Sequence, residues 1–443
     1  MTETKISRQK THQQTDIRDP GSFVFGMLLA LLWGGHTAAF YLPGSKYLYL
    51  ASLLCILILA ELRMVIRHWR VPRGGYRCGV APALACWFFA ATASTILNAS
   101  VEQVGVTYCF VFLTGAALYI VFDGTTLRTW ELEIGVIGLA IGSLFPLLAG
   151  LRAFYQEWGW SDAQTALSAY LDPQKMASYE DATFGNRGNT AAFIVLIAPL
   201  FLWMLLDRSR SWFTRLFCGS MLLPILLNLL ILEVRAAFLS LALGLALVWG
   251  FKFGARRIWI FIFGGAIGIG LLFWYTPDVA EIVSPRLQTA LRVDTVNDPS
   301  VFERADAMRE GMAIGGRNWL CGIGPGGALT QHSQTSAHQF FIQQFMETGV
   351  LGLVGSVVFS CGVFWIMLRT LARGEDGGTN NTRFAMVIGP VCFVSYGIVA
   401  NFTLNNGYVN SWTVLVVSML AFTPRLEEKR LDRAIKNIAG LAG

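Results

Sequence analysis

The chain has 443 residues, of which 54% are hydrophobic, 13% aromatic and only 14% charged. About a quarter of the residues of a soluble domain are charged, so this composition excludes an ordinary water-soluble protein and indicates lipid as the main solvent. The formal charge of +6 does not indicate a nucleic-acid partner, because the lysines and arginines lie in short blocks between apolar runs.

Apolar runs divide the chain into twelve predicted transmembrane helices. About 20 apolar residues, each rising about 1.5 Å, cross a hydrocarbon layer roughly 30 Å thick. The predicted spans are 22–42, 47–64, 79–98, 104–122, 132–151, 190–207, 216–233, 236–251, 258–276, 350–370, 384–404 and 408–424. The sequence therefore predicts an all-α polytopic membrane protein, with residues 1–443 forming a single integral membrane domain and no cleaved signal peptide at the polar start.

Basic residues predict the orientation of these spans. Most of the 34 lysines and arginines fall in alternate connections, and positive residues are retained on the cytoplasmic side, so both termini are predicted to be cytoplasmic. Two long segments, 151–189 and 277–349, then lie on the opposite side. Loops of this length are usually functional, and we expect the second one, between spans nine and ten, to carry the active site.

The second outer loop begins with an expected helix and continues into a glycine-rich turn. Ser300-Val-Phe-Glu303 has capping-box spacing and precedes the amphipathic run 304–314, which predicts a short helix at the membrane interface. Gly322-Ile-Gly-Pro-Gly326, with three glycines and a proline, predicts tight turns and close backbone approach.

His338 is the candidate catalytic residue of this loop. Ser336-Ala-His-Gln339 again has capping-box spacing and is expected to open a helix over 340–347, with Gly349 as its C′ residue. His338 would then lie in the first turn, where the helix dipole disfavours imidazolium and favours a neutral imidazole that accepts a proton. A polar cap residue at the membrane interface is the alternative interpretation.

Three arginines on the outer side are candidate ligands for phosphate, namely Arg187, Arg235 and Arg304. Interfacial arginines commonly extend to lipid headgroups. Arg235 is different, because it lies between two apolar runs, where a charge indicates function, although Glu233 offers a structural partner. A guanidinium group binds two phosphate oxygens at once and keeps its charge. Arginines beside a neutral imidazole therefore predict a site for a phosphate-bearing lipid.

No dedicated metal site is predicted. The eight cysteines include no Cys-x-x-Cys pair, and the chain has neither a His-Glu-x-x-His motif nor an Asp-x-Asp motif. His36, beside Gly34 and Gly35 in the first span, is interpreted as a packing residue. We therefore expect neither a metal nor a cofactor.

These features together resemble the O-antigen ligase family. The resemblance covers roughly 186–352 and rests on a long outer loop before the last three spans, Arg235 followed by Ala-Ala-Phe-Leu-Ser240, the helix led by Arg304, the turn 322–326, and His338 before Glu347-Thr-Gly-Val-Leu-Gly352. Arg187 resembles a family arginine that precedes the sixth span. Gln339 stands where the family commonly has asparagine.

The resemblance implies transfer of O-antigen polysaccharide from undecaprenyl diphosphate to the lipid A core oligosaccharide, among the lipids of a Gram-negative inner membrane and at its periplasmic face. His338 would take the proton of the acceptor hydroxyl. Arg187, Arg235 and Arg304 would hold the diphosphate in place of a metal, with inversion at the anomeric carbon. Gln339, Gly322 and Gly324 would support the site.

Other functions remain open at this point. An O-antigen polymerase or a protein O-oligosaccharyltransferase of the same superfamily would use the same donor with another acceptor. Twelve spans also suit a secondary transporter or flippase, although such proteins often have matched halves, and the outer loops here are unequal. A structural scaffold would leave the outer arginines replaceable.

Overall fold

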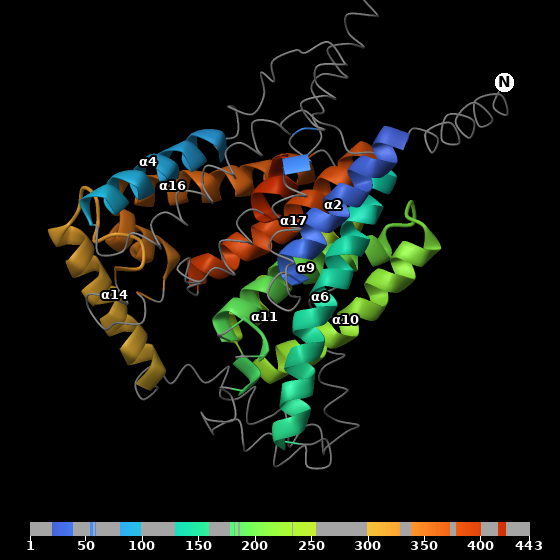
Figure 1. Cartoon of the computed structure of the whole chain (residues 1–443), viewed down its shortest axis with the longest axis horizontal. Coiled ribbons are helices and arrows are strands. Elements are labelled where there is room, and N and C mark those ends of the chain that lie inside the picture. Colours follow the sequence, from blue (N-terminus) through green and yellow to red (C-terminus); the bar gives the residue numbers. More distant parts are fainter. Residues whose placement is uncertain are drawn as a thin grey trace, which may run out of the picture.

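The computed structural model describes residues 20–38, 54–55, 58, 80–98, 129–158, 178–180, 182–184, 187–232, 234–253, 299–327, 337, 339–372, 378–399 and 415–421. Over these ranges every regular element is a helix (Figure 1). The long helices are α2 (Pro20–Ala38), α4 (Val80–Leu97), α6 (Thr129–Trp158), α9 (Arg187–Leu206), α10 (Trp212–Leu232), α11 (Arg235–Phe253), α14 (Pro299–Arg317), α16 (Phe340–Leu371) and α17 (Gly378–Val399). The predicted all-α class is confirmed for this part of the chain.

Four of these helices contain a segment that is long and apolar enough to cross a membrane, namely Trp130–Glu157, Arg187–Leu206, Trp212–Leu229 and Phe340–Leu371. Shorter apolar helices cover Phe23–Gly35, Pro82–Leu97, Ala236–Lys252 and Arg383–Val399. All eight coincide with predicted spans. Predicted spans 47–64, 104–122, 258–276 and 408–424 fall wholly or largely outside the described residues, so the total of twelve stays a prediction.

The helices that flank the first predicted outer loop, 151–189, extend beyond their apolar runs. Helix α6 continues past position 151 to Trp158, and α9 begins at Arg187 rather than at 190. Charged residues such as Arg152 and Glu157 end an apolar run, but they are good helix formers, so the helix continues beyond the hydrophobic segment. The predicted loop 151–189 therefore includes helical residues at both ends.

Large apolar side chains remain exposed along several helices, as expected for surfaces that face lipid. Examples are Phe89, Ile96, Leu97, Phe213, Leu216, Leu223, Leu239 and Leu368. Soluble monomers rarely expose apolar patches of this extent. The exposed faces therefore agree with the membrane character that the composition predicts.

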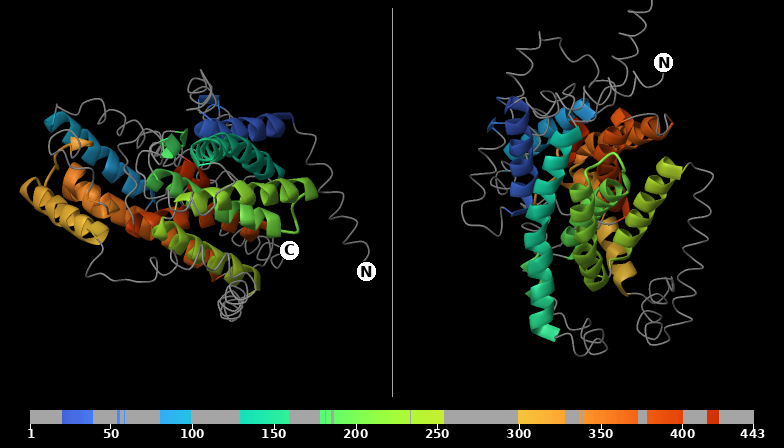
Figure 2. Two further views of the ribbon diagram at one scale, coloured as in Figure 1. Left: turned by 90° about the horizontal axis from the view of Figure 1, so that it is seen from below. Right: turned by 90° about the vertical axis from the view of Figure 1, so that its right-hand side faces the viewer.

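Helices α4, α14 and α16 form one side of the molecule, and α2, α6 and α10 form the other, with α9, α11 and α17 between them (Figures 1 and 2). Helix α2 lies along α6 through small residues: a Cβ on Gly138 would stand 2.5 Å from the Cα of Ala30. Such close approach maximises van der Waals contact between helices in lipid.

The central helices have a defined register. A Cβ on Gly244 of α11 would lie 3.0 Å from Pro199 Cγ of α9 and 2.8 Å from Cys392 Sγ of α17. The ring centroids of Trp203 and Phe251 lie 5.3 Å apart, further along both α9 and α11. The two helices therefore run in the same direction and begin at the same end of the bundle.

Candidate functional site

A sharp bend at Gly349 shapes the site. Gly349 has φ 71° and ψ −163°, a backbone region that is essentially restricted to glycine, within α16. The ring of Trp87 in α4 contacts both limbs of the bent helix, with centroid distances of 5.9 Å to Phe340 and 5.3 Å to Phe359. Helix α16 is therefore two helices that share Gly349, as expected from its predicted role as a C′ residue, and the second limb corresponds to the predicted span 350–370.

The glycine-rich turn replaces the hydrogen bonds that the bend removes. Backbone groups near Gly349 cannot complete the regular helical pattern, and buried backbone groups without partners are costly. Three bonds to the segment 319–324 satisfy them: Val350 N to Trp319 O at 2.8 Å, Ile323 N to Met346 O at 2.9 Å, and Gly324 N to Glu347 O at 3.0 Å. The turn and the bend thus form one backbone unit.

The glycines of the turn are required by geometry. Gly322, Gly324 and Gly326 have φ values of 68°, 94° and 79°. A Cβ on Gly322 would overlap the carbonyl group of Glu347, which leaves no space for any side chain. The predicted tight turns and the close backbone approach at Gly322 are confirmed.

Glu347 is a buried carboxylate that the sequence interpretation did not single out. The residue is fully buried, and its Oε1 accepts hydrogen bonds from the amide of Gly326 at 3.2 Å and from Gln343 Nε2 at 2.5 Å. Its backbone carbonyl also accepts a bond from Ser94 Oγ of α4 at 2.7 Å. A buried charge requires such partners, and an acidic residue in an apolar run beside Gly349 was the available signal.

The start of α16 differs from the prediction. The N-cap is Gln339, whose Oε1 accepts a bond from Ile342 N at 2.8 Å, and the first helical residue is Phe340. Ser336 is therefore not the cap, and His338 precedes the cap instead of lying in the first turn. His338 itself is outside the described residues, so its proposed role remains a prediction. Gln339 is the N-cap of α16, and its supporting role in the reaction also remains a prediction.

Helix α14 packs beside this start. A Cβ on Gly311 would lie 2.9 Å from the Cβ of Ala337, and one on Gly315 would lie 2.5 Å from Phe345 Cδ1. The two helices therefore run in the same direction, with Arg304 about two turns before the level of Ala337, or about 10 Å along the axis. The predicted helix over 304–314 is confirmed as part of a longer one, and Arg304 on it is exposed.

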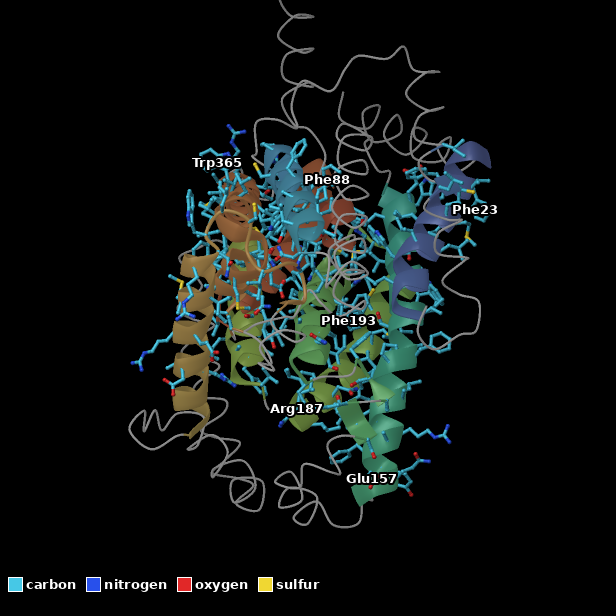
Figure 3. The ribbon with its side chains drawn as sticks, turned by 60° about the vertical axis from the view of Figure 1, so that its left-hand side comes forward. Phe23, Phe88, Glu157, Arg187, Phe193 and Trp365 are labelled. Atoms are coloured by element: carbon cyan, nitrogen blue, oxygen red, sulfur yellow. The ribbon has the colours of Figure 1, made fainter. Side chains whose placement is uncertain are left out.

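The two other arginines begin neighbouring helices. Arg187 opens α9 with its side chain 40% exposed, and its Nε lies 2.9 Å from Glu180 Oε1. Figure 3 shows Arg187 at the end of the bundle near Glu157 and far from Phe23 and Trp365. Arg235 opens α11 at the same end, because α9 and α11 run together; its side chain is outside the described residues.

Tyr396 connects the end of α17 to the start of α9. The hydroxyl of Tyr396, in the last turn of α17, donates a hydrogen bond to the carbonyl of Gly188 at 3.0 Å. The end of α17 is therefore fixed beside the start of α9, where Arg187 lies.

Residues 220–357 match the family model described as O-antigen ligase. The resemblance to the O-antigen ligase family is confirmed. The O-antigen ligase match includes Arg235, Arg304, the turn 322–326 and the bend at Gly349. Members of this family are membrane glycosyltransferase-like enzymes that act on polysaccharide and lipid substrates. No curated protein matches the chain.

Proposed function

We propose that the chain is an O-antigen ligase that transfers O-antigen polysaccharide from undecaprenyl diphosphate to the lipid A core oligosaccharide. The reaction would take place at the periplasmic face of the inner membrane of a Gram-negative bacterium. The observations that carry the proposal are the match of residues 220–357 to the O-antigen ligase family and the positions of Arg187 and Arg235 at the starts of two parallel helices, α9 and α11. Two guanidinium-bearing helices beside an apolar bundle suit a donor that has a diphosphate head and a lipid tail.

In the proposed reaction an acceptor hydroxyl attacks the anomeric carbon of the glycan. His338 takes the hydroxyl proton as the new C–O bond forms. The bond between the anomeric carbon and the diphosphate oxygen breaks, its electron pair stays on the diphosphate, and the configuration inverts. Arg187, Arg235 and Arg304 stabilise the growing negative charge, a task that metal ions perform in many glycosyl transfers. No metal is required of the site.

The test is reconstituted transfer to purified lipid A core from glycan-loaded undecaprenyl diphosphate, with a chelator present. We expect transfer by the wild type and its loss in His338→Ala and Arg304→Ala, at equal amounts of folded protein. Arg309→Ala is the matched control, because Arg309 lies on the same helix but pairs only with the exposed Asp306 among the described residues. Full activity of the His338 and Arg304 variants would contradict the assigned roles.

The acceptor decides between this function and its relatives. The family match is shared by polymerases of the superfamily, which extend the glycan on its carrier. The same assay is therefore run with the loaded carrier alone and with a pilin-type protein. Modification of either of these, with lipid A core unmodified, would replace the ligase proposal with a polymerase or a protein glycosyltransferase. Carrier movement without any glycosyl transfer would indicate a flippase.

A further inference from the structure

A chain of buried hydrogen bonds connects the glycine turn to Ala337, the residue before His338. Glu347 and Gln343 stand one helical turn apart on the same face of the first limb of α16. The Oε1 of Glu347 accepts from Gln343 Nε2, and the Oε1 of Gln343 accepts from the backbone amide of Ala337 at 2.8 Å. Gln343 thus uses both ends of its amide, with Glu347 at one end and Ala337 at the other.

The other end of this chain is equally fixed. Glu347 Oε1 also accepts from the amide of Gly326, at the far end of the turn 322–326. Gln343 is 1% exposed, Ala337 2% and Glu347 0%. Water is excluded from these bonds, and a buried polar network with every member paired holds its parts in one arrangement.

Packing from α14 supports the same backbone segment from another side. Gly311 lies directly against Ala337 and Ile342, where any side chain would clash. The backbone just before His338 is therefore fixed by Gln343 through a hydrogen bond and by α14 through contact. Arg304 lies on that same α14, so one assembly holds both the backbone at Ala337 and the helix that bears Arg304.

We propose that Gln343 and Glu347 are positioning residues for His338. Glu347 orients the Gln343 amide and locks the glycine turn, and Gln343 holds the backbone from which His338 extends. The inference rests on the proposed function, in which His338 is the base. Neither residue contacts substrate in this scheme. Misplacement of a reacting group by about 1 Å reduces catalysis by about a hundredfold, so loss of the positioning chain acts on kcat.

The test compares four variants in lipid nanodiscs. Gln343→Leu removes both amide ends at similar volume, and Glu347→Ala removes the carboxylate. Glu347→Gln keeps an Oε1 that accepts from Gly326 and Gln343. Gln344→Leu is the matched control, since Gln344 is the adjacent residue of the same type and is also fully buried. Two quantities are measured: kcat and donor KM for transfer, and the hydrogen exchange rates of peptides that contain Gly326 and Ala337.

The expected result is a fall in kcat of about tenfold to a hundredfold in Gln343→Leu and Glu347→Ala, with donor KM unchanged. Exchange is expected to accelerate at Ala337 in both variants and at Gly326 in Glu347→Ala. Glu347→Gln should stay close to wild type, and Gln344→Leu should retain kcat and slow exchange at both sites. If Glu347→Ala fails to fold, the kcat and exchange rates of Gln343→Leu are compared with those of Glu347→Gln and wild type.

Three outcomes would overturn the positioning role. These are an unchanged kcat in Gln343→Leu, an equal fall in Gln344→Leu, or a rise in KM with kcat intact. Activity is measured on whichever acceptor the wild type modifies. A wild type that only extends the glycan on its carrier would overturn the ligase proposal, whereas the comparison among the variants would still decide the positioning role.

Discussion

The hydroxyl of Tyr396 donates a hydrogen bond to the carbonyl of Gly188 across 3.0 Å, and so joins the last turn of α17 to the first turn of α9. Gly188 directly follows Arg187 in the chain. One buried phenol therefore holds the arginine-bearing start of α9 against the end of α17.

Tyr396→Phe should weaken both stability and donor binding. A buried hydrogen bond contributes about 1 kcal/mol, and its loss leaves the Gly188 carbonyl with one fewer donor. We expect a lower unfolding temperature in nanodiscs and a higher KM for the undecaprenyl diphosphate donor. Tyr155→Phe, at a half-exposed tyrosine of α6, is the control and should change neither. Unchanged stability and KM in Tyr396→Phe would mean that this bond does not position Arg187.

Gly349→Ala should destabilise the protein strongly, whereas Gly316→Ala should not. An alanine at 349 would adopt a positive φ and drive its Cβ into the carbonyl oxygen of Leu320. Backbone strain of this kind costs about 1–3 kcal/mol before the clash is counted. At Gly316, in the last turn of α14, an added Cβ would have no neighbouring atom within 4 Å, and alanine there gains about 0.5–1 kcal/mol of helix stability.

Thermal unfolding of the two glycine variants, side by side with wild type, measures this difference. The expected order of stability is Gly316→Ala at or above wild type, with Gly349→Ala well below it. Equal stability of the two variants would show that α16 can straighten at Gly349 without loss of the bonds to segment 319–324.

Arg187 offers a test that separates ion pairing from substrate binding. Its pair with Glu180 is partly exposed, at 40% and 25% of the two side chains, and such pairs contribute about 0–1 kcal/mol. Glu180→Gln should therefore leave stability and transfer nearly unchanged. Arg187→Ala should raise donor KM and reduce kcat/KM, and Arg187→Lys should rescue it poorly, because an ammonium cannot bind the diphosphate bidentately. Equal effects of Glu180→Gln and Arg187→Ala would assign Arg187 to the ion pair alone.

Asp207 provides a prediction on pH. Burial raises the pKa of this carboxyl, but hydrogen bonds from Ser209 and the charge of Arg210 outweigh burial, so the pKa lies below its ordinary value of 3.8. A carboxyl whose pKa is lowered by folding stabilises the protein above its unfolded pKa, and this contribution is lost as the pH falls through the folded pKa. The Arg210 Nε lies 2.9 Å from Asp207 Oδ2, and both side chains are almost completely buried.

Asp207→Asn should therefore be less stable than wild type by a constant amount from neutral pH down to about pH 5. The difference should shrink below about pH 4, as the wild-type carboxylate becomes protonated. Unfolding temperatures of both proteins, measured in the same nanodiscs across this pH range, give the comparison. A difference that grows as the pH falls would contradict the lowered pKa.

Much of the helical framework could be predicted because bilayer thickness sets the length of apolar runs. The helix ends could not. Arg152 and Glu157 end the hydrophobic run of α6 without ending its helix, because charged residues with long side chains are compatible with helix. The tight turn predicted at Gly322 and the helix end predicted at Gly349 were confirmed. Both positions have a positive φ, which strongly favours glycine.

The residues of the candidate site could be singled out from the sequence, but the contacts that support them could not. Gln339 was not expected as a cap, because glutamine is not among the preferred N-cap residues. Glu347 was seen only as part of a motif, since its bond to Gly326 depends on a turn that folds back onto the bend. Pairings of this kind depend on tertiary structure and leave no periodic signal in the sequence.

The join between the glycine turn and the bend also determines how freely this part of the chain can vary. The three bonds that connect segment 319–324 to residues 346–350 run from backbone to backbone, so they impose no side-chain identity on Trp319, Ile323 or Met346. The glycines and the buried Glu347 are restricted by space or charge, and Ile323 and Met346 are restricted to apolar side chains because they are buried with Ile314. A library randomised over this region should therefore retain folded members with many different apolar side chains, and very few without Gly322 or Gly349.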